Sequence, residues 1–283
     1  MEHLDYACRR CQGTSRLSMA KDIRTTSFSR SLTIQFRVIG ALLMREVLTR
    51  YGRHNIGFLW VFAEPMMFTL VIAGLWSVLH MTNSNIPIIP FAVTGWSSLI
   101  LWRSMPSRCS GAVAPNLALM YHRNVKIIDI YASRILLEFF GATMSFAILC
   151  IGFTAVDWMP FPEDILKIIF GWLMLAWFGA ALALNVGPMS ELFQSFDKIW
   201  APIALLMMPL SGAMFMVEWL PDSAQKLVLY VPMVHGVEII REGCFGSTIR
   251  AHYDVSYMAT VCLCLTLLGL SLTRKISSRV TSE

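Results

Sequence analysis

The sequence predicts an all-α membrane protein with six transmembrane helices, and three observations support this. Apolar residues make up 56% of the 283-residue chain and charged residues only 14%, too few for the surface of a soluble protein of this length. Six apolar stretches reach the length of about 17–25 residues that a helix needs to cross a bilayer. The basic residues gather before the first stretch and in alternate loops.

The predicted spans follow one another and are joined by mostly short segments. They are Ile56–Leu79, Ile86–Trp102, Ile135–Val156, Ile168–Val186, Ile199–Val217 and Val255–Leu272. The loop between the first two is so short that these helices must be antiparallel neighbours. We assign residues 31–275 to one transmembrane domain, residues 1–30 to a flexible basic cytoplasmic tail and residues 276–283 to a second cytoplasmic tail.

The segment before the first span predicts an amphipathic helix in the inner membrane interface. Apolar residues recur there at helical spacing on one face, and polar residues fall on the opposite face. The apolar set is Leu32, Phe36, Ile39, Leu43 and Val47, and the opposite set includes Arg45, Thr49 and Arg53. A plain cytosolic helix packed on a soluble partner is the alternative.

The distribution of basic residues predicts the orientation. Ten of the 23 Lys and Arg residues precede residue 54. With the N-terminus inside, 19 of the 23 lie on the inner side, so the positive-inside rule places both termini in the cytoplasm. The net charge of +5 follows from this asymmetry, and we therefore do not expect nucleic-acid binding.

Two connecting segments depart from simple loops. The inner segment Arg103–Arg134 holds Pro106 and Pro115 and predicts a broken helix along the membrane surface. The outer segment between the fifth and sixth spans has an apolar middle, Leu227–Ile240, that is too short to cross the bilayer. We expect this stretch to be re-entrant or interfacial.

Few residues suggest chemistry. A mid-membrane carboxylate costs about 2.5–3.5 kcal/mol, so Glu64 should face protein or water. Glu138 is expected to reach the inner surface beside Arg134, four residues before it.

Metal and enzyme sites have little support. His235 and Glu238, with Arg241 three residues later, allow a metal or acid–base site, but no second His motif accompanies them. Cys8 and Cys11 lack two further zinc ligands nearby. We expect neither a metal nor an enzyme activity, and no carboxylate ladder indicates a proton relay.

The chain has no Gly-rich turn feeding a Lys of the kind that cradles nucleotide phosphates. If transport by this chain uses ATP, a separate polypeptide must therefore bind and hydrolyse it. The chain itself needs no cofactor, and ATP with Mg would belong to that partner subunit.

Several segments together resemble the ABC-2 type permeases that export capsular polysaccharide. They are Thr49–Trp60 with Glu64-Pro65, Tyr121–Lys126 with Asp129, Arg134 with Leu137-Glu138, Met208–Gly212, and Pro232–Glu238. The resemblance covers about residues 31–275, with matching order and spacing.

The resemblance implies a multi-pass subunit of the bacterial inner membrane that forms a homodimer and works with an ABC ATP-binding subunit. It implies a lipid-linked polysaccharide as cargo, moved from cytoplasm to periplasm. It also implies a periplasmic co-polymerase and an outer-membrane export protein as further partners.

The resemblance further implies roles for three sets of residues. The ATPase-coupling set is Tyr121, His122, Arg123, Asn124, Lys126 and Asp129. The gate set on the interfacial helix is Arg45, Arg50 and Arg53, where positive groups would attract a phosphate linkage. The outer gate set is His235, Glu238 and Arg241. The alternative for the coupling set is that its charges only set topology.

Three other functions stay open. An ABC-2 permease for O-antigen or another cargo would share these motifs. An ATP-independent secondary transporter would show paired inverted segments or mid-helix acidic relays, and neither stands out. A membrane scaffold without transport would leave the coupling-like segment unexplained.

Overall fold

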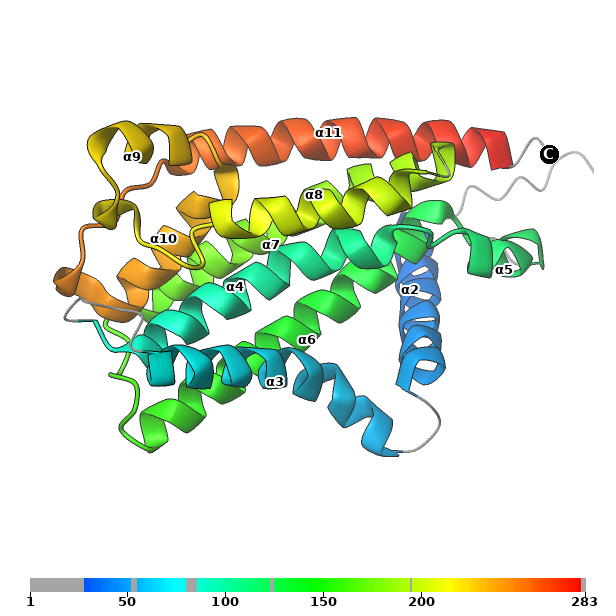
Figure 1. Cartoon of the computed structure of the whole chain (residues 1–283). Helices are drawn as coiled ribbons and strands as arrows, with labels where there is room; N and C mark the ends of the chain where they lie inside the picture. The colour runs from blue at the N-terminus through cyan, green and yellow to red at the C-terminus, as the bar shows by residue number, and fades with distance from the viewer. Residues whose placement is uncertain (1–27, 52–54, 80–85, 123–124, 194, 281–283) are drawn as a thin grey trace, which may run out of the picture. The chain divides into compact units, whose positions relative to one another are not determined.

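The computed structural model describes residues 28–51, 55–79, 86–122, 125–193 and 195–280. Within these ranges every regular element is helical and no strand occurs (Figure 1). The long helices are α2 (Phe28–Tyr51), α3 (Asn55–Leu79), α4 (Ile88–Cys109), α6 (Ile127–Ala155), α7 (Ile165–Leu192), α8 (Phe196–Leu210), α10 (Pro232–Phe245) and α11 (Val255–Val280). The short elements are η1 (Ala114–Asn116), α5 (Leu117–His122), η2 (Val217–Trp219), α9 (Asp222–Val228) and η3 (Gly246–Thr248).

The chain divides into two compact units between Val38 and Ile39. The described part of the first unit is the start of α2, where Leu32, Ile34 and Phe36 are exposed. The second unit holds the rest of α2 and all the other helices.

Helix α7 is the central helix of the second unit and packs against α4, α10 and α11. Glycines allow these approaches. A Cβ on Gly179 would lie only 2.9 Å from the Cα of Trp102 on α4, and one on Gly171 only 2.9 Å from Ile240 on α10. Small residues at helix contacts let backbones come close, which is how helices associate in a membrane without a hydrophobic driving force.

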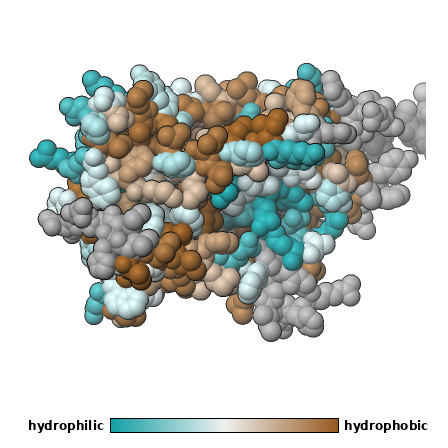
Figure 2. Space-filling model, viewed as in Figure 1, coloured by the Kyte–Doolittle hydropathy of each residue, from teal (hydrophilic) through white to brown (hydrophobic). Residues whose placement is uncertain are grey.

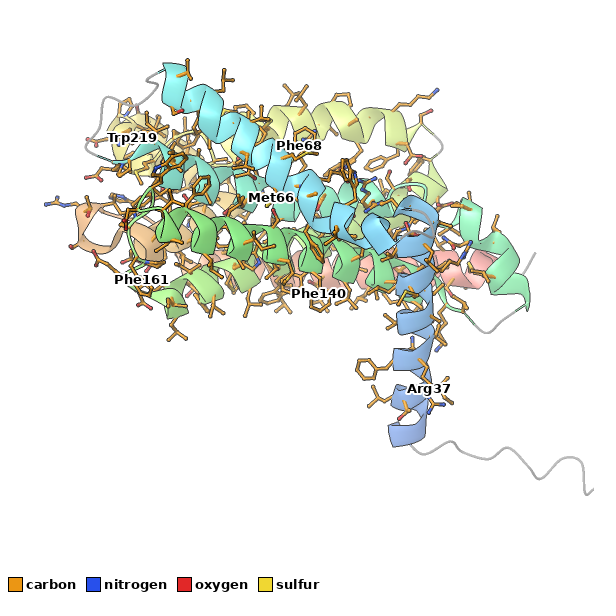
Figure 3. The ribbon with its side chains drawn as sticks, turned by 90° about the horizontal axis from the view of Figure 1, so that it is seen from below. Arg37, Met66, Phe68, Phe140, Phe161 and Trp219 are labelled. Carbon is orange, nitrogen blue, oxygen red and sulfur yellow. The ribbon has the colours of Figure 1, made fainter. Side chains whose placement is uncertain are left out.

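Four helices are long and apolar enough to cross a membrane, judged over the described residues alone. The candidate membrane spans in these helices are Leu59–Val78, Ile127–Ala155, Ile165–Leu192 and Val255–Ser278. These correspond to the first, third, fourth and sixth predicted spans. Large apolar side chains on their flanks are exposed, among them Phe68 and Phe140, as expected for surfaces that face lipid (Figures 2 and 3).

The second predicted span lies in α4, which is less apolar because it carries several hydroxyl groups. Two of these groups are satisfied inside the helix: the Thr94 hydroxyl donates to the Pro90 carbonyl at 2.8 Å, and the Ser98 hydroxyl to the Thr94 carbonyl at 2.6 Å. The buried hydroxyl oxygens of Ser97 and Ser104 have no hydrogen-bond partner among the described residues. Hydrogen bonds therefore offset the burial of Thr94 and Ser98, whereas burial of the Ser97 and Ser104 hydroxyls carries a desolvation cost.

The predicted end of the fifth span at Val217 is wrong, because α8 has only 15 residues and ends at Leu210. The chain then turns through Gly212, whose φ of +76° is accessible mainly to glycine. The turn was hidden in the sequence because the residues after it are as apolar as the helix. The inner segment is broken as predicted, at Gly111 with a φ of +61°, whereas Pro106 lies inside α4.

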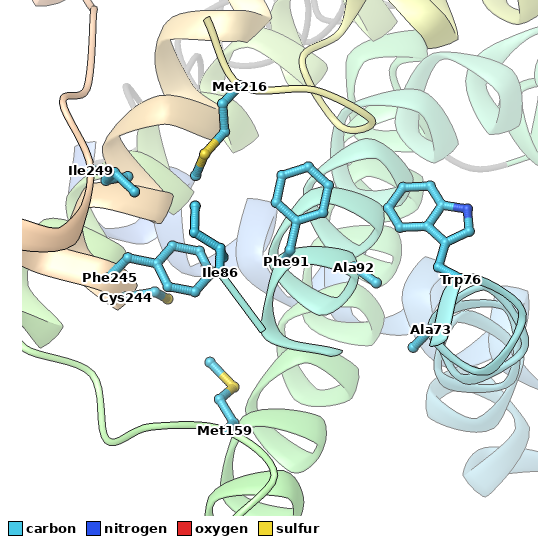
Figure 4. Packing of buried hydrophobic residues seen from close by; sticks show 10 residues of the cluster. All are labelled: Ala73, Trp76, Ile86, Phe91, Ala92, Met159, Met216, Cys244, Phe245 and Ile249. Atoms are coloured by element: carbon cyan, nitrogen blue, oxygen red, sulfur yellow. The ribbon is translucent and has the colours of Figure 1, made fainter. Parts of the chain in front are cut away.

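Apolar residues from distant segments form one core cluster at the end of the second unit that carries α9 and α10 (Figure 4). Its members are Ala73, Trp76, Ile86, Phe91, Ala92, Met159, Met216, Cys244, Phe245 and Ile249. The Phe91 ring lies 5.8 Å from that of Trp76 and 5.2 Å from that of Trp219, measured between centroids. Aromatic contacts therefore tie α3, α4 and η2 together here.

Candidate functional site

The two ends of the second unit differ in how their charges are satisfied. We call the end where α4 finishes and α6 begins the basic end, because Arg45, Arg50, Arg103, Arg108 and Arg134 lie there. The end that carries α9 and α10 is called the far end. Both ends hold residues that the sequence singles out.

Four helices meet at ion pairs around Glu138. Its Oε1 lies 2.7 Å from Arg50 Nη1 on α2 and 3.5 Å from Arg108 Nε on α4. Arg108 Nη2 also lies 3.5 Å from Glu64 Oε1 on α3. The Arg50 and Glu138 side chains are 17% and 13% exposed, against 41% and 37% for Arg108 and Glu64. The Arg50–Glu138 pair is therefore the stronger contact, because water screens it less.

Glu138 and Arg134, which lie four residues apart on α6, do not pair with each other but each pairs with α2. Arg134 instead places Nε 3.3 Å from Glu46 Oε1 on α2, and its Nη1 donates to the Arg108 carbonyl at 2.6 Å. Helix α2 packs against this part of α6 and supplies ion-pair partners for both residues. Spacing along a single helix does not reveal such partners. Two crossed ion pairs thus fasten α2 to α6.

A cavity of about 380 Å³ opens beside these ion pairs, between α3, α4 and α6. The space-filling view shows a hydrophilic hollow on this face (Figure 2). Phe68, Trp96 and Leu99 line its apolar part, and Glu64 and Arg103 are among its charged residues. Arg103 forms no ion pair with any other described residue. The cavity offers both a cation and an apolar wall, which suits a ligand with an anionic group on an apolar body.

The loop after α4 is held to three helices by its polar groups. Asn116 accepts a hydrogen bond from Arg45 Nη1 at 2.6 Å and donates to the Ala112 carbonyl at 2.8 Å. The Val113 amide donates to Glu191 Oε1 at 3.2 Å on α7. The Ser110 hydroxyl bonds Asp197 on α8. Because α5 follows this loop directly, these contacts connect the start of α5 to α2, α7 and α8.

The residues predicted to couple to an ATPase lie in and after α5. Tyr121 and His122 belong to α5, and Lys126 is exposed just before α6. Arg123 and Asn124 lie outside the described residues. Asp129 is only 2% exposed, and its Oδ2 accepts from the Lys126 amide at 3.0 Å, so it caps α6. Among the members whose side chains the structure describes, only Lys126 is exposed, and the assignment of the set to coupling stays a prediction.

The residues predicted for the interfacial gate are engaged where they are described. Arg45 bonds Asn116, and Arg50 pairs with Glu138. Arg53 lies outside the described residues. Glu64, predicted to face protein or water, lines the cavity and pairs with Arg108, which agrees with that expectation.

At the far end, Arg241 on α10 is fully buried. Its guanidinium donates to the carbonyls of Gly212, Ala213 and Phe215 at 2.7, 2.8 and 2.5 Å, and its Cζ lies 4.2 Å from the Phe91 ring centroid. These bonds hold the turn that follows α8. Burial lowers the pKa of Arg241 to about 10, so the side chain stays charged near neutral pH.

Glu238 and His235 also bind main-chain groups. Glu238 accepts from the Val217 and His252 amides, both at 3.3 Å, and burial raises its pKa while Arg241 and these amides oppose the rise. His235 Nδ1 accepts from the Asp254 amide at 2.9 Å, and burial lowers its pKa. All three predicted outer-gate residues are thus buried and form hydrogen bonds with main-chain groups. Their role in gating stays a prediction.

The sequence reasoning gave no site role to two residues. Arg103 lines the cavity, and Asn116 joins the loop after α4 to α2. A signal for the cavity did exist in the two carboxylates of apolar helices, Glu64 and Glu138, because such groups need partners on neighbouring helices. No three His, Cys, Asp or Glu side chains of the described chain cluster as metal ligands would, and Cys8 and Cys11 lie outside it.

The ABC-2 type transporter family matches residues 37–245. This range is most of the chain, and it includes Glu138, the cavity beside it and Arg241. The chain belongs to this family. Among its relatives is the capsule polysaccharide export inner-membrane protein CtrC of Neisseria meningitidis serogroup A, 41% identical over 261 residues. That alignment covers 92% of this chain and 98% of CtrC.

Two other relatives of this ABC-2 chain show the same coverage pattern. The capsule polysaccharide export inner-membrane protein BexB of Haemophilus influenzae is 39% identical over 256 residues, covering 90% of this chain and 97% of BexB. The polysialic acid transport protein KpsM of Escherichia coli is 27% identical over 249 residues, covering 85% and 94%. The resemblance seen in the sequence motifs is confirmed.

Proposed function

We propose that this chain is the membrane-spanning permease subunit of an ATP-driven exporter that moves lipid-linked capsular or related surface polysaccharide from cytoplasm to periplasm. One observation carries the proposal: relatives named for capsule polysaccharide export align with this chain over nearly their whole length. The ion-paired cavity and the loop tied to α2, α7 and α8 supply a physical route for its action.

The permease would cross the inner membrane six times, through α3, α4, α6, α7, α8 and α11. Residues 31–275 would form this transmembrane domain between two cytoplasmic tails. Helix α2 would lie in the inner interface, and α10 would be re-entrant at the outer face. The density of arginines at the basic end supports a cytoplasmic position for that end and for both termini.

The driving step would begin on a partner. An ABC ATP-binding subunit would bind ATP and Mg and hydrolyse the ATP, and this chain would not be an enzyme. The partner would dock on α5 and the residues after it, where Lys126 suits an acidic surface. Movement of α5 would pass through Asn116 to α2 and through Ser110 and Val113 to α8 and α7. Two such chains would form a homodimer with the conduit between them.

The cargo would enter next to α2. Breaking the Arg50–Glu138 and Arg134–Glu46 pairs would release α2 from α6 and open the cavity toward the lipid. The freed arginines, together with Arg103, would attract a phosphate linkage at the lipid-linked end of the polymer. Beyond the outer gate at His235, Glu238 and Arg241, a periplasmic co-polymerase and an outer-membrane export protein would continue the path.

The test is co-purification of this chain with a candidate ABC ATP-binding subunit, followed by measurement of ATP hydrolysis in detergent. Charge reversal of Arg123 and Lys126 to Glu should abolish complex formation or uncouple hydrolysis. Lys226→Glu is the matched control, because it reverses an exposed charge on α9 at the far end and should leave the complex intact. Failure of any ATP-binding subunit to associate would exclude the proposal and favour a secondary transporter.

Cargo is tested separately, by export of capsule in a strain that lacks its own permease. An ABC-2 permease for O-antigen or another cargo would form the complex and hydrolyse ATP but would not restore capsule at the cell surface. The relatives include proteins named for capsule polysaccharide export and for polysialic acid transport. The export experiment is therefore needed to identify the polysaccharide that this chain moves.

A further inference from the structure

A second cavity at the basic end is separate from the cavity beside Glu138 and shares only Lys126 with the residues described above. It has a volume of about 350 Å³ and lies between the start of α6 and the last turns of α11. Lys126 and Arg274 supply its cationic side, and Ile128 and Leu270 its apolar side. Its walls therefore combine two positive charges with a hydrocarbon surface.

The cations of this cavity are available to an anion. The Lys126 and Arg274 side chains are both exposed, and neither forms an ion pair with another residue of the described chain. No carboxylate of the described residues lines the cavity. The nearby Asp129 is buried and uses its Oδ2 to cap α6 through the Lys126 amide. The cavity is thus a pocket of positive potential.

The position of the cavity fits the headgroup level of a membrane. The candidate membrane span in α6 begins at Ile127 and the one in α11 ends at Ser278, so both spans finish beside the cavity. From the cavity, Leu270, Leu267 and Leu263 follow one side of α11 toward the middle of the span, with 44%, 57% and 51% of their surfaces exposed. An acyl chain along this stripe would reach the hydrocarbon core while its headgroup stayed in the cavity.

We propose that this cavity binds the phosphate headgroup of an anionic phospholipid such as phosphatidylglycerol. Lys126 and Arg274 would hold the phosphate, and the leucine stripe of α11 would hold one acyl chain. Basic pockets between transmembrane helices on the cytoplasmic side are suited to anionic lipids. The assignment to the cytoplasmic leaflet rests on the membrane orientation given in the proposed function. The preference for an anionic phospholipid rests only on the residues that line the cavity.

The experiment uses the full chain alone in detergent, with no ATP-binding subunit, and measures lipid binding by native mass spectrometry. Phosphatidylglycerol is compared with phosphatidylcholine of the same acyl chains. Arg274→Gln should weaken phosphatidylglycerol binding about fivefold, the effect of one interfacial cation. Lys275→Gln is the matched control: it removes the same charge one residue along α11, outside the cavity, and should change binding less than about twofold.

A second variant keeps the charges and fills the space. Leu270→Trp should also weaken binding of phosphatidylglycerol, and gel filtration of each variant verifies folding. Equal binding of the two lipids, or equal losses from Arg274→Gln and Lys275→Gln, would overturn the proposal and leave only diffuse surface charge. Full displacement of the lipid by millimolar inorganic phosphate would overturn it too, in favour of a free-anion site. Because no partner is present, none of these outcomes depends on whether the chain exports polysaccharide.

Discussion

The Arg50–Glu138 ion pair offers the sharpest test of how the basic end is held together. Glu138→Gln keeps the size of the side chain but removes its charge. The pair is short at 2.7 Å and mostly shielded from water, with 17% and 13% of the side chains exposed. A charge-assisted hydrogen bond of this kind contributes about 1.5–3 kcal/mol. For a chain of this size each kcal/mol shifts the melting temperature by about 2–4 °C, so a loss of about 2 kcal/mol predicts a fall of about 4–8 °C.

The assay is thermal unfolding of the detergent-solubilised chain, followed by fluorescence-detected gel filtration. Lys167→Gln is the control, because it breaks an ion pair of similar length, 3.0 Å to Glu242, at an exposed position of the far end. That variant should shift the melting temperature by less than half as much. A double variant with Arg50→Gln should lose little beyond either single variant. Equal shifts for Glu138→Gln and Lys167→Gln would refute the reasoning, as would fully additive losses in the double variant.

Three other predictions follow from the site. Arg241→Leu leaves three buried carbonyls without a donor, so it should cost at least about 3 kcal/mol and sharply reduce the yield of folded protein, measured by gel filtration after extraction. Asn116→Ala should retain the ATP-binding subunit but lower polymer exported per ATP hydrolysed several-fold, and Asn116→Asp, which keeps an acceptor for Arg45, should restore the ratio. Burial lowers the folded-state pKa of His235, so the stability that depends on its neutral form is present above about pH 6.5 and lost as the pH falls through the folded pKa. The melting temperature should therefore drop on acidification, and less so in His235→Gln; an unchanged pH dependence in that variant would exclude His235 as the cause.

Hydropathy and charge alone predicted the helical class and four of the spans, because a long apolar run has few alternatives in a membrane protein. The same reasoning placed the end of the fifth span wrongly. Residues 213–217 are apolar, yet residues 211–217 form a turn and the first residue of η2 rather than a continuation of α8. Their carbonyls are satisfied by Arg241, which lies about 25–30 residues further along the chain. A window of local hydropathy contains no information about such a distant donor.

The sequence pointed to the carboxylates of the candidate site, but it did not show which cation each carboxylate pairs with. A carboxylate inside an apolar helix has to find a cation, so Glu64 and Glu138 pointed to a site. Which cation each finds depends on how α2, α4 and α6 pack. The i−4 rule favoured Arg134 for Glu138, whereas tertiary contacts gave Glu138 to Arg50 and Arg134 to Glu46. Local spacing is worth only a few tenths of a kcal/mol for such pairs, and packing overrides it.

The contrast between the two ends bears on which of them moves. At the far end, Arg241 and Glu238 bind main-chain groups, and breaking those bonds would leave buried carbonyls and amides without partners. At the basic end, side chains pair with side chains across helices beside a cavity of about 380 Å³, so each partner can exchange its contact for water or for an anionic ligand. The free-energy cost of opening is therefore lower at the basic end. If the chain opens to admit a polymer, α2 should separate from α6 before the turn held by Arg241 moves, and a disulfide between these two helices should block export while one within α10 and that turn should not.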